Sequence, residues 1–103
     1  MKTTGHYITA EVVINPQWSV EQGAQALAAF CVAMEQEAGC QMAIALGDNS
    51  DPRRFILWER YASPAAHQQH FTQPHTREFI DAGWVSLVRV YETTFDGVEH
   101  HHD

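Results

Sequence analysis

The sequence predicts one α+β domain, in which four antiparallel strands form a sheet and the helices cover one of its faces. Segments with strand composition and segments with helical periodicity follow one another in the order strand, helix, strand, strand, helix, strand. This order is the ferredoxin-like βαββαβ pattern. The chain has 103 residues, of which 45% are apolar and 18% are charged, as in an ordinary globular domain. No internal repeat or linker divides it, so we expect residues 1–103 to form a single domain.

The first strand and the long helix come from the first 40 residues. Residues 6–14 have strand composition, and the proline of the following Asn-Pro pair ends the strand because it has no amide donor. Ser19 and Gln22 match a capping box, which predicts a helix from Ser19 to about Ala38. Gly39 suits the position after the helix end. Spacings of four and three residues alternate along the apolar face, which consists of Val20, Ala24, Leu27, Cys31, Met34 and Ala38.

Three further strands are predicted. Residues 40–46 form the second strand, and the turn-forming residues 47–52 separate it from the third strand over residues 54–61. The fourth strand covers residues 84–95 and precedes a polar tail. The tail contains three consecutive histidines, which could bind nickel adventitiously or be a tag remnant and say nothing of function.

A broken helical region lies between the third and fourth strands. Ser63 is a plausible N-cap, and Pro64 suits the first helical position. A second helix start follows at Pro74, and Gly83 ends the region. We therefore expect helical structure over about residues 64–82, with an interruption before Pro74.

Charge and hydropathy exclude several classes of function. The chain has 13 acidic and 6 basic residues, a formal net charge of −7, which argues against nucleic acid and anionic membranes as partners. No apolar run approaches the ~18 residues that span a membrane, and the N-terminus lacks the apolar region of a signal peptide. We therefore expect a cytoplasmic protein.

Cys31 and Cys40 are interpreted as reduced thiols used as small apolar residues.

The predicted sheet is apolar on both faces. On the third strand, Phe55 and Leu57 point to one face, and Ile56 and Trp58 point to the other. The same alternation divides the apolar residues of two other strands between the faces. On the fourth strand it places Leu87 and Tyr91 opposite Val88 and Val90. On the first strand it places one set opposite Tyr7 and Val13, and this set consists of Ile8, Ala10, Val12 and Ile14. The helices can cover only one face, and the other would be too large an apolar patch for a soluble monomer. We therefore expect a homodimer that packs sheet against sheet, with Trp58 in the interface.

Most of the chemically active side chains lie on the strand-to-helix unit over residues 54–83. His70 lies four residues after Ala66, on the same helical face. It could act as a general base, because a histidine ordinarily titrates near pH ~6.5. It could equally be a half-buried histidine that caps the helix end.

Glu59 and Tyr61 point to the same face of the sheet because they lie two residues apart. Glutamate is disfavoured inside strands, so Glu59 needs a partner if it faces the core, and Arg89 and His70 are the candidates. Glu59 is then either a second candidate base or a structural link between strand and helix. Tyr61 either donates to a substrate oxygen or is an aromatic side chain at the core rim.

The remaining candidates form an expected substrate-binding set, which consists of His75, Phe71, Arg89 and Leu57. His75 lines the pocket mouth or is a solvated residue at the helix start, and Arg89 could stabilise a developing oxyanion. His67 and His70 are three residues apart, but no third ligand is placed to complete a metal site, so none is predicted. No nucleotide or dinucleotide fingerprint is present, and we expect no cofactor.

Three segments carry a resemblance to a known family. They are Glu37–Cys40, with the sequence EAGC, then Phe55–Tyr61, with the sequence FILWERY, and the helical pattern that contains Ala66, His70 and His75. In these segments the chain resembles the antibiotic biosynthesis monooxygenase family, small dimeric α+β barrels that include quinol monooxygenases. The resemblance implies a dimeric α+β barrel with a small-molecule pocket.

Two positions depart from the family pattern. Ala38 stands where relatives often have proline, and Met42 stands near a position where they often have an aromatic residue. Members of the family include cofactor-free oxygenases of quinols or polycyclic phenols, haem-degrading enzymes, isomerases of small sugar-like signals, and proteins without demonstrated activity. The fold therefore transfers more safely than the reaction.

The first functional hypothesis is a cofactor-independent monooxygenase that oxidises a quinol-like or phenolic small molecule with O₂. The substrate would supply the electrons, and His70 or an ion-paired Glu59 would deprotonate it. The alternatives are a non-oxidative isomerase that uses the same side chains for proton transfer, and a non-catalytic barrel that binds a small aromatic ligand. Haem breakdown is a further alternative.

Overall fold

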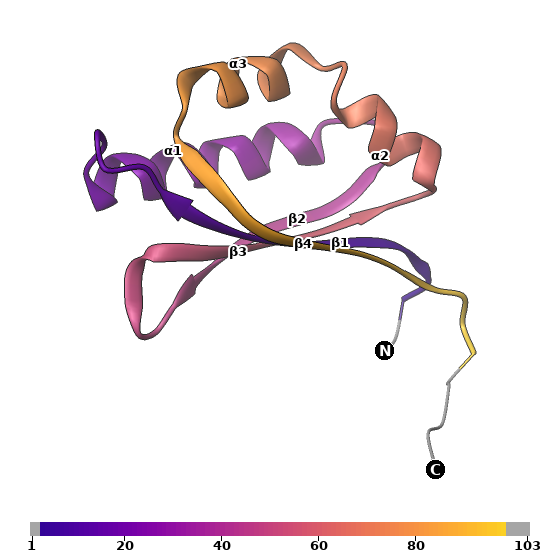
Figure 1. The fold of residues 1–103 in the computed structure, drawn as a ribbon. Coiled ribbons are helices and arrows are strands. Elements are labelled where there is room, and N and C mark those ends of the chain that lie inside the picture. The colour runs from indigo at the N-terminus through magenta and orange to yellow at the C-terminus, as the bar shows by residue number, and fades with distance from the viewer. Residues whose placement is uncertain (1–2, 99–103) are drawn as a thin grey trace.

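The computed structural model describes residues 3–98 and contains one antiparallel sheet with its helices on one face (Figure 1). The elements in chain order are β1 (Gly5–Ile14), α1 (Val20–Glu35), β2 (Cys40–Asp48), β3 (Asp51–Tyr61), α2 (Pro64–His70), α3 (Pro74–Ala82) and β4 (Val85–Phe95). The strand order across the sheet is β2-β3-β1-β4. The predicted α+β, ferredoxin-like βαββαβ fold is therefore confirmed.

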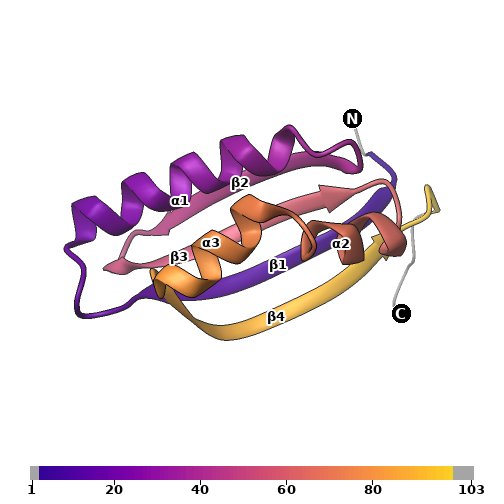
Figure 2. The ribbon, with the colours of Figure 1, turned by 90° about the horizontal axis from the view of Figure 1, so that it is seen from above.

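The helices cover the sheet unevenly. Seen from above, α1 follows β2, whereas α2 and α3 lie over the middle of the sheet, and these three helices leave β4 uncovered (Figure 2). Nearly every residue of β4 is exposed. The chain therefore leaves one side of the space between helices and sheet open, along β4.

The core lies between α1 and the inner face of the sheet. Alternate residues of β1 are buried, as the period-two pattern predicts, and they pack with residues of α1 and β3. Leu27 and Met34 of α1 are completely buried against this layer. Cys31 and Cys40 are buried, unpaired thiols, and burial raises the pKa of each to about 11, so both stay protonated.

Local sequence signals set most helix ends. Ser19 and Gln22 form the predicted capping box, with each side chain accepting a hydrogen bond from the other residue's backbone N–H. Ser63 caps α2 by accepting from the backbone N–H of Ala66. Gly83 ends α3 with a φ of 66°, the left-handed region that glycine enters without strain.

The predicted end of α1 is wrong. The helix ends at Glu35 and has a right-handed C-cap at Gln36, so Ala38 is exposed and does not extend the apolar face. Gly39 is required for a different reason, since a Cβ there would lie 2.4 Å from the Cβ of Ala66. The glycine thus allows α2 to pack closely on the corner between α1 and β2.

The capping box gives a stability prediction. Ser19→Ala should lower the free energy of unfolding by roughly 1 kcal/mol, because an amide of the first turn loses its acceptor. Chemical denaturation measures this difference, and Ser50→Ala in the exposed turn between β2 and β3 serves as the control. Equal midpoints for the two variants would show that the cap contributes nothing.

Candidate functional site

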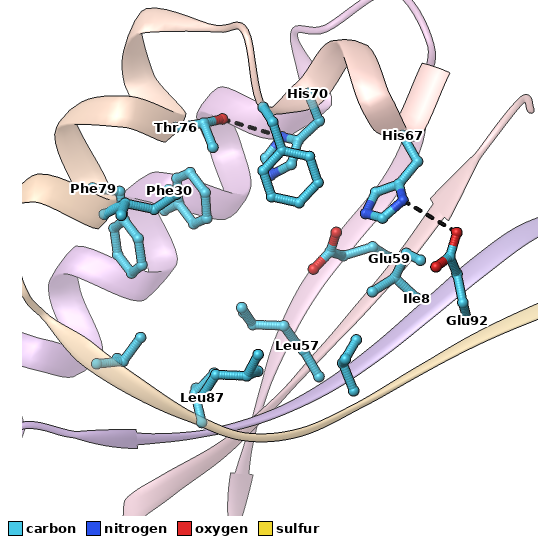
Figure 3. Close-up of a pocket in the computed structure, with 16 residues that line it drawn as sticks. Ile8, Phe30, Leu57, Glu59, His67, His70, Thr76, Phe79, Leu87 and Glu92 are labelled. Atoms are coloured by element: carbon cyan, nitrogen blue, oxygen red, sulfur yellow. Dashed lines mark hydrogen bonds and ion pairs between the residues drawn. The ribbon is translucent and has the colours of Figure 1, made fainter. Parts of the chain in front are cut away.

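A cavity of about 410 Å³ lies between the helix layer and the inner face of the sheet (Figure 3). Its wall is mainly apolar, with most of its aliphatic residues from the strands and its aromatic residues from the helix layer. The apolar lining residues are Ile8, Ala10, Val12, Phe30, Leu57, Phe71, Phe79, Ile80, Val85, Leu87 and Val90. Glu59, His67, His70, Thr76 and Glu92 are its polar and charged residues. A mainly apolar cavity with a few convergent polar groups is typical of a small-molecule site.

His70, the last residue of α2, is held by a buried carboxylate. Its Nδ1 lies 2.8 Å from Oε2 of Glu37 and 3.2 Å from Oγ1 of Thr76. An ionised carboxylate can only accept, so Nδ1 carries the hydrogen that is donated to Glu37. The lone pair of the neutral ring then lies on Nε2. A carboxylate that fixes the tautomer in this way prepares an imidazole to accept a proton.

Glu37 also binds His75. The Nε2 atom of His75 lies 2.5 Å from the same Oε2, so one carboxylate, 7% exposed, joins α2 and α3. His75 does not line the cavity but a shallow groove between α1 and α3. Sequence reasoning did not select Glu37 as a site residue. The signal that could have found it is its place in the EAGC corner, within the family resemblance.

Glu59 is buried in the cavity wall and hydrogen-bonded to Tyr61. The Tyr61 hydroxyl donates to Oε1 of Glu59 at 2.7 Å, and Glu59 is only 5% exposed. Burial raises the pKa of Glu59, while the hydrogen bond from Tyr61 and the nearby His70 oppose this rise. Burial and the Glu59 charge also raise the pKa of Tyr61, so the phenol keeps its proton. Tyr61 is completely buried and does not line the cavity.

The raised pKa of Glu59 leads to a pH prediction. The folded protein retains a proton that the unfolded chain releases, so stability falls as pH rises from the ordinary glutamate value through the folded pKa. Glu59→Gln cannot ionise and escapes this loss. The unfolding free energy of Glu59→Gln minus that of the wild type should therefore increase from pH 4 to pH 7 in urea titrations. A difference that does not change with pH would contradict the raised pKa.

A second group of titratable side chains lies at the other end of the cavity. Nε2 of His6 lies 2.9 Å from Oε1 of Glu92, and Nδ1 of His67 lies 3.6 Å from the same oxygen. Burial lowers the pKa of His67, although Glu92 opposes this shift. The hydrogen bond from His6 lowers the pKa of Glu92. Sequence reasoning selected neither His6 nor Glu92, because only the pairing of β1 with β4 brings them together.

The expected substrate-binding set is divided by the fold. Leu57 and Phe71 line the cavity, whereas Arg89 and His75 do not. Arg89 pairs with Glu11 in the register and has its guanidinium 4.7 Å from the ring centre of Tyr91. It is therefore not the partner of Glu59.

Arg89 does not reach the cavity because β4 contains a β-bulge. The strict alternation assumed for the fourth strand is therefore wrong. The register between β1 and β4 shifts between Glu11 and Val12, so β4 carries one extra residue there. Leu87 and Val90, predicted on opposite faces, both line the cavity. A bulge leaves little trace in composition or periodicity, so the alternating pattern could not show it.

The outer face of the sheet carries the predicted apolar side chains around Trp58, together with an ion pair between Arg54 and Glu11. Trp58 is 40% exposed there and stacks on Tyr7 with ring centres 6.0 Å apart. Ile44 and Leu46 of β2 are exposed beside it, paired in the register with Trp58 and Ile56. Within residues 3–98, no helix is long and apolar enough to cross a membrane.

A comparison with protein-family models gives a match. The family described as antibiotic biosynthesis monooxygenase matches residues 8–82. A search of curated proteins found no match.

Solved structures share the fold at low sequence identity. The structural genomics protein YJCS has a TM-score of 0.81 at 22% identity, with 88% of this chain and 98% of that one covered. A Pseudomonas aeruginosa protein has a TM-score of 0.73 at 21% identity, with 96% and 99% covered. A structure titled antibiotic biosynthesis monooxygenase has a TM-score of 0.74 at 18% identity, with 91% and 99% covered.

Proposed function

Because this chain belongs to the antibiotic biosynthesis monooxygenase family, we propose that it oxidises a quinol-like or phenolic small molecule with O₂, without a cofactor. The observation that carries the proposal is the hydrogen bond between His70 and buried Glu37, at the wall of a mainly apolar cavity. The arrangement combines one oriented base with a mainly apolar binding surface.

The first step is deprotonation of the substrate. Nε2 of His70 takes the phenolic proton, and Glu37 stabilises the imidazolium that forms, since it already accepts the hydrogen of Nδ1. The resulting phenolate is electron-rich enough to reduce O₂ directly. In a phenol with an unsubstituted para position, one oxygen atom becomes a new carbonyl oxygen. The other leaves as water with the two hydrogens lost from the ring carbon and the hydroxyl. The substrate thus supplies all the electrons.

Other cavity residues have supporting roles in this proposal. Phe30 and Phe79, stacked with ring centres 4.1 Å apart, form an aromatic wall, and Leu57 and Phe71 complete the surface for a planar ring. Glu59 is the second group that can exchange a proton with the substrate, because burial raises its pKa. Tyr61 donates a hydrogen bond to Glu59 and so positions it, which makes the role of Tyr61 in the reaction indirect.

One observation favours a second candidate function. His70 and Glu59 both line the same cavity, and an imidazole with a protonatable carboxyl group is the pair that an isomerase needs. Such an enzyme would move a proton between two positions of a small metabolite and would consume no oxygen.

Oxygen uptake with a panel of hydroquinones and phenols separates these functions. The proposal predicts uptake above the spontaneous rate for at least one compound, without an added reductant or metal. Because hydroquinones oxidise in air, His70→Ala serves as the matched control for that background. Conversion of a compound without oxygen uptake would support the isomerase, and binding without turnover would support a ligand-binding protein.

We also propose that the protein is a homodimer, with the outer faces of two sheets packed together. The support is the exposed apolar surface around Trp58, Ile44 and Leu46, which lies on the face opposite α1, α2 and α3 (Figure 1). The dimer would bury this surface and leave the cavity on the helix side of each subunit.

A further inference from the structure

The end of the cavity nearest the start of β1 brings together three side chains of the types that bind metals. His6 comes from β1, His67 from α2 and Glu92 from β4, and one ligand atom of each lies within 4.8 Å of the others. Figure 3 shows His67 and Glu92 facing each other at this end of the cavity. We propose that His6, His67 and Glu92 form a binding site for a divalent transition-metal ion.

The spacing of the ligand atoms fits such an ion. Two ligands about 2.1 Å from one ion are roughly 3.0 Å apart at a right angle and 3.4 Å apart at the tetrahedral angle. Oε1 of Glu92 lies 2.9 Å from Nε2 of His6 and 3.6 Å from Nδ1 of His67. Small side-chain rotations would therefore close the three atoms around an ion.

The chemistry of the ligands selects the class of ion. Two imidazoles and one carboxylate suit zinc, iron(II), cobalt(II) or nickel(II) better than calcium or magnesium, which prefer oxygen ligands. Three protein ligands leave positions for water or for an oxygen atom of a bound molecule. Because His67 and Glu92 line the cavity, a molecule in the cavity could occupy such a position.

The surroundings also fit a metal site. Both imidazoles are largely buried, whereas the Glu92 side chain is 58% exposed and gives an ion a route from solvent. The other nitrogen of His6, Nδ1, lies 3.3 Å from Oγ1 of Thr94. A second hydrogen-bond partner of this kind orients a histidine ligand in many metal sites.

The cluster of Glu37, His70 and His75 differs in geometry. One oxygen of Glu37 lies 2.8 Å and 2.5 Å from the two histidine nitrogens, and Thr76 also contacts His70. The contact between His6 and Glu92 is also a hydrogen bond, but its 2.9 Å separation suits two ligands of one ion, whereas 2.5 Å is too short. This cluster therefore provides an internal control.

The inference does not depend on the proposed oxidation, because deprotonation by His70 requires no metal. It does revise the expectation of no metal site, which considered only His67 and His70 on one helix. The fold directs these two histidines to different carboxylates, Glu92 and Glu37. The ligands that complete the site come from distant parts of the chain.

The test is calorimetric titration of the metal-free full chain with Co²⁺, together with the visible absorption of the bound ion. His100, His101 and His102 are first replaced by glutamine, because consecutive histidines bind such ions on their own. We expect one Co²⁺ per chain. Glu92→Gln and His67→Gln should each weaken binding at least tenfold, whereas His75→Gln should leave it unchanged.

Glu92→Gln is the decisive variant, because an exposed and nearly isosteric change preserves the fold, which circular dichroism would verify. An absence of Co²⁺ binding to the parent protein would overturn the proposal. So would a folded Glu92→Gln protein with the parent's affinity, or an equal loss in His75→Gln. None of these readouts requires a substrate, so they stand apart from the test of oxidation.

Discussion

Replacement of His70 by alanine should lower turnover by roughly 10²–10⁴-fold, the usual contribution of a positioned general base. The variant should also lose stability, because His70 is buried and its removal takes one hydrogen-bond donor from buried Glu37. Loss of such a partner costs about 1–3 kcal/mol. The rate of oxygen uptake and the melting temperature must therefore be measured on the same preparation.

His70→Asn separates the chemical role from the structural one. Its amide nitrogen lies near the place of Nδ1 and can donate to Glu37, which preserves the hydrogen bond, but the amide cannot accept a proton as imidazole does. We expect this variant to recover most of the lost stability and little of the lost turnover. Wild-type turnover in either folded variant would remove His70 from the mechanism and make Glu59 the next candidate base.

The second large effect concerns assembly. The wild-type protein should sediment at micromolar concentration with about twice the chain mass of 11.7 kDa. Trp58→Asp should convert it to a monomer, because a carboxylate would be buried without a partner at the centre of the sheet-to-sheet interface. The folded chain should tolerate the change, since Trp58 lies on the outer face of the sheet, 40% exposed.

Val32→Asp is the matched control for this prediction. Val32 is an exposed apolar residue of α1, on the helix side of the molecule, so its replacement adds the same charge far from the proposed interface. It should remain dimeric. A monomeric wild-type protein would refute the dimer, and a dimeric Trp58→Asp protein would show that another surface forms it.

The features that could be predicted from the sequence depend on neighbouring residues. Period-two burial of β1, the capping box of Ser19 and Gln22, and the stop at Gly83 each arise within a few residues of chain. Together these signals define the order of elements, and the order defines the fold. The close contact of Gly39 with Ala66 was missed because it joins two elements that only the folded chain brings together.

The candidate site was predictable only in part, for the same reason. His70 and Glu59 were selected from a single strand-to-helix unit, and both line the cavity. Their environment was not predictable, because Glu37 approaches His70 from the corner after α1, and Glu92 approaches His67 from β4. The β-bulge of β4, opposite Glu11, turns Arg89 away from the cavity. No local sequence pattern marks this bulge.

The fate of the oxygen atoms tests the proposed monooxygenase activity most directly. A compound that supports oxygen uptake would be converted under ¹⁸O₂ in unlabelled water, with no added reductant, and the product would be analysed promptly by mass spectrometry. The proposal predicts one labelled oxygen atom in each product molecule and loss of this product with His70→Asn. Enzymatic product without label, or label incorporated at the same rate by His70→Asn, would contradict it.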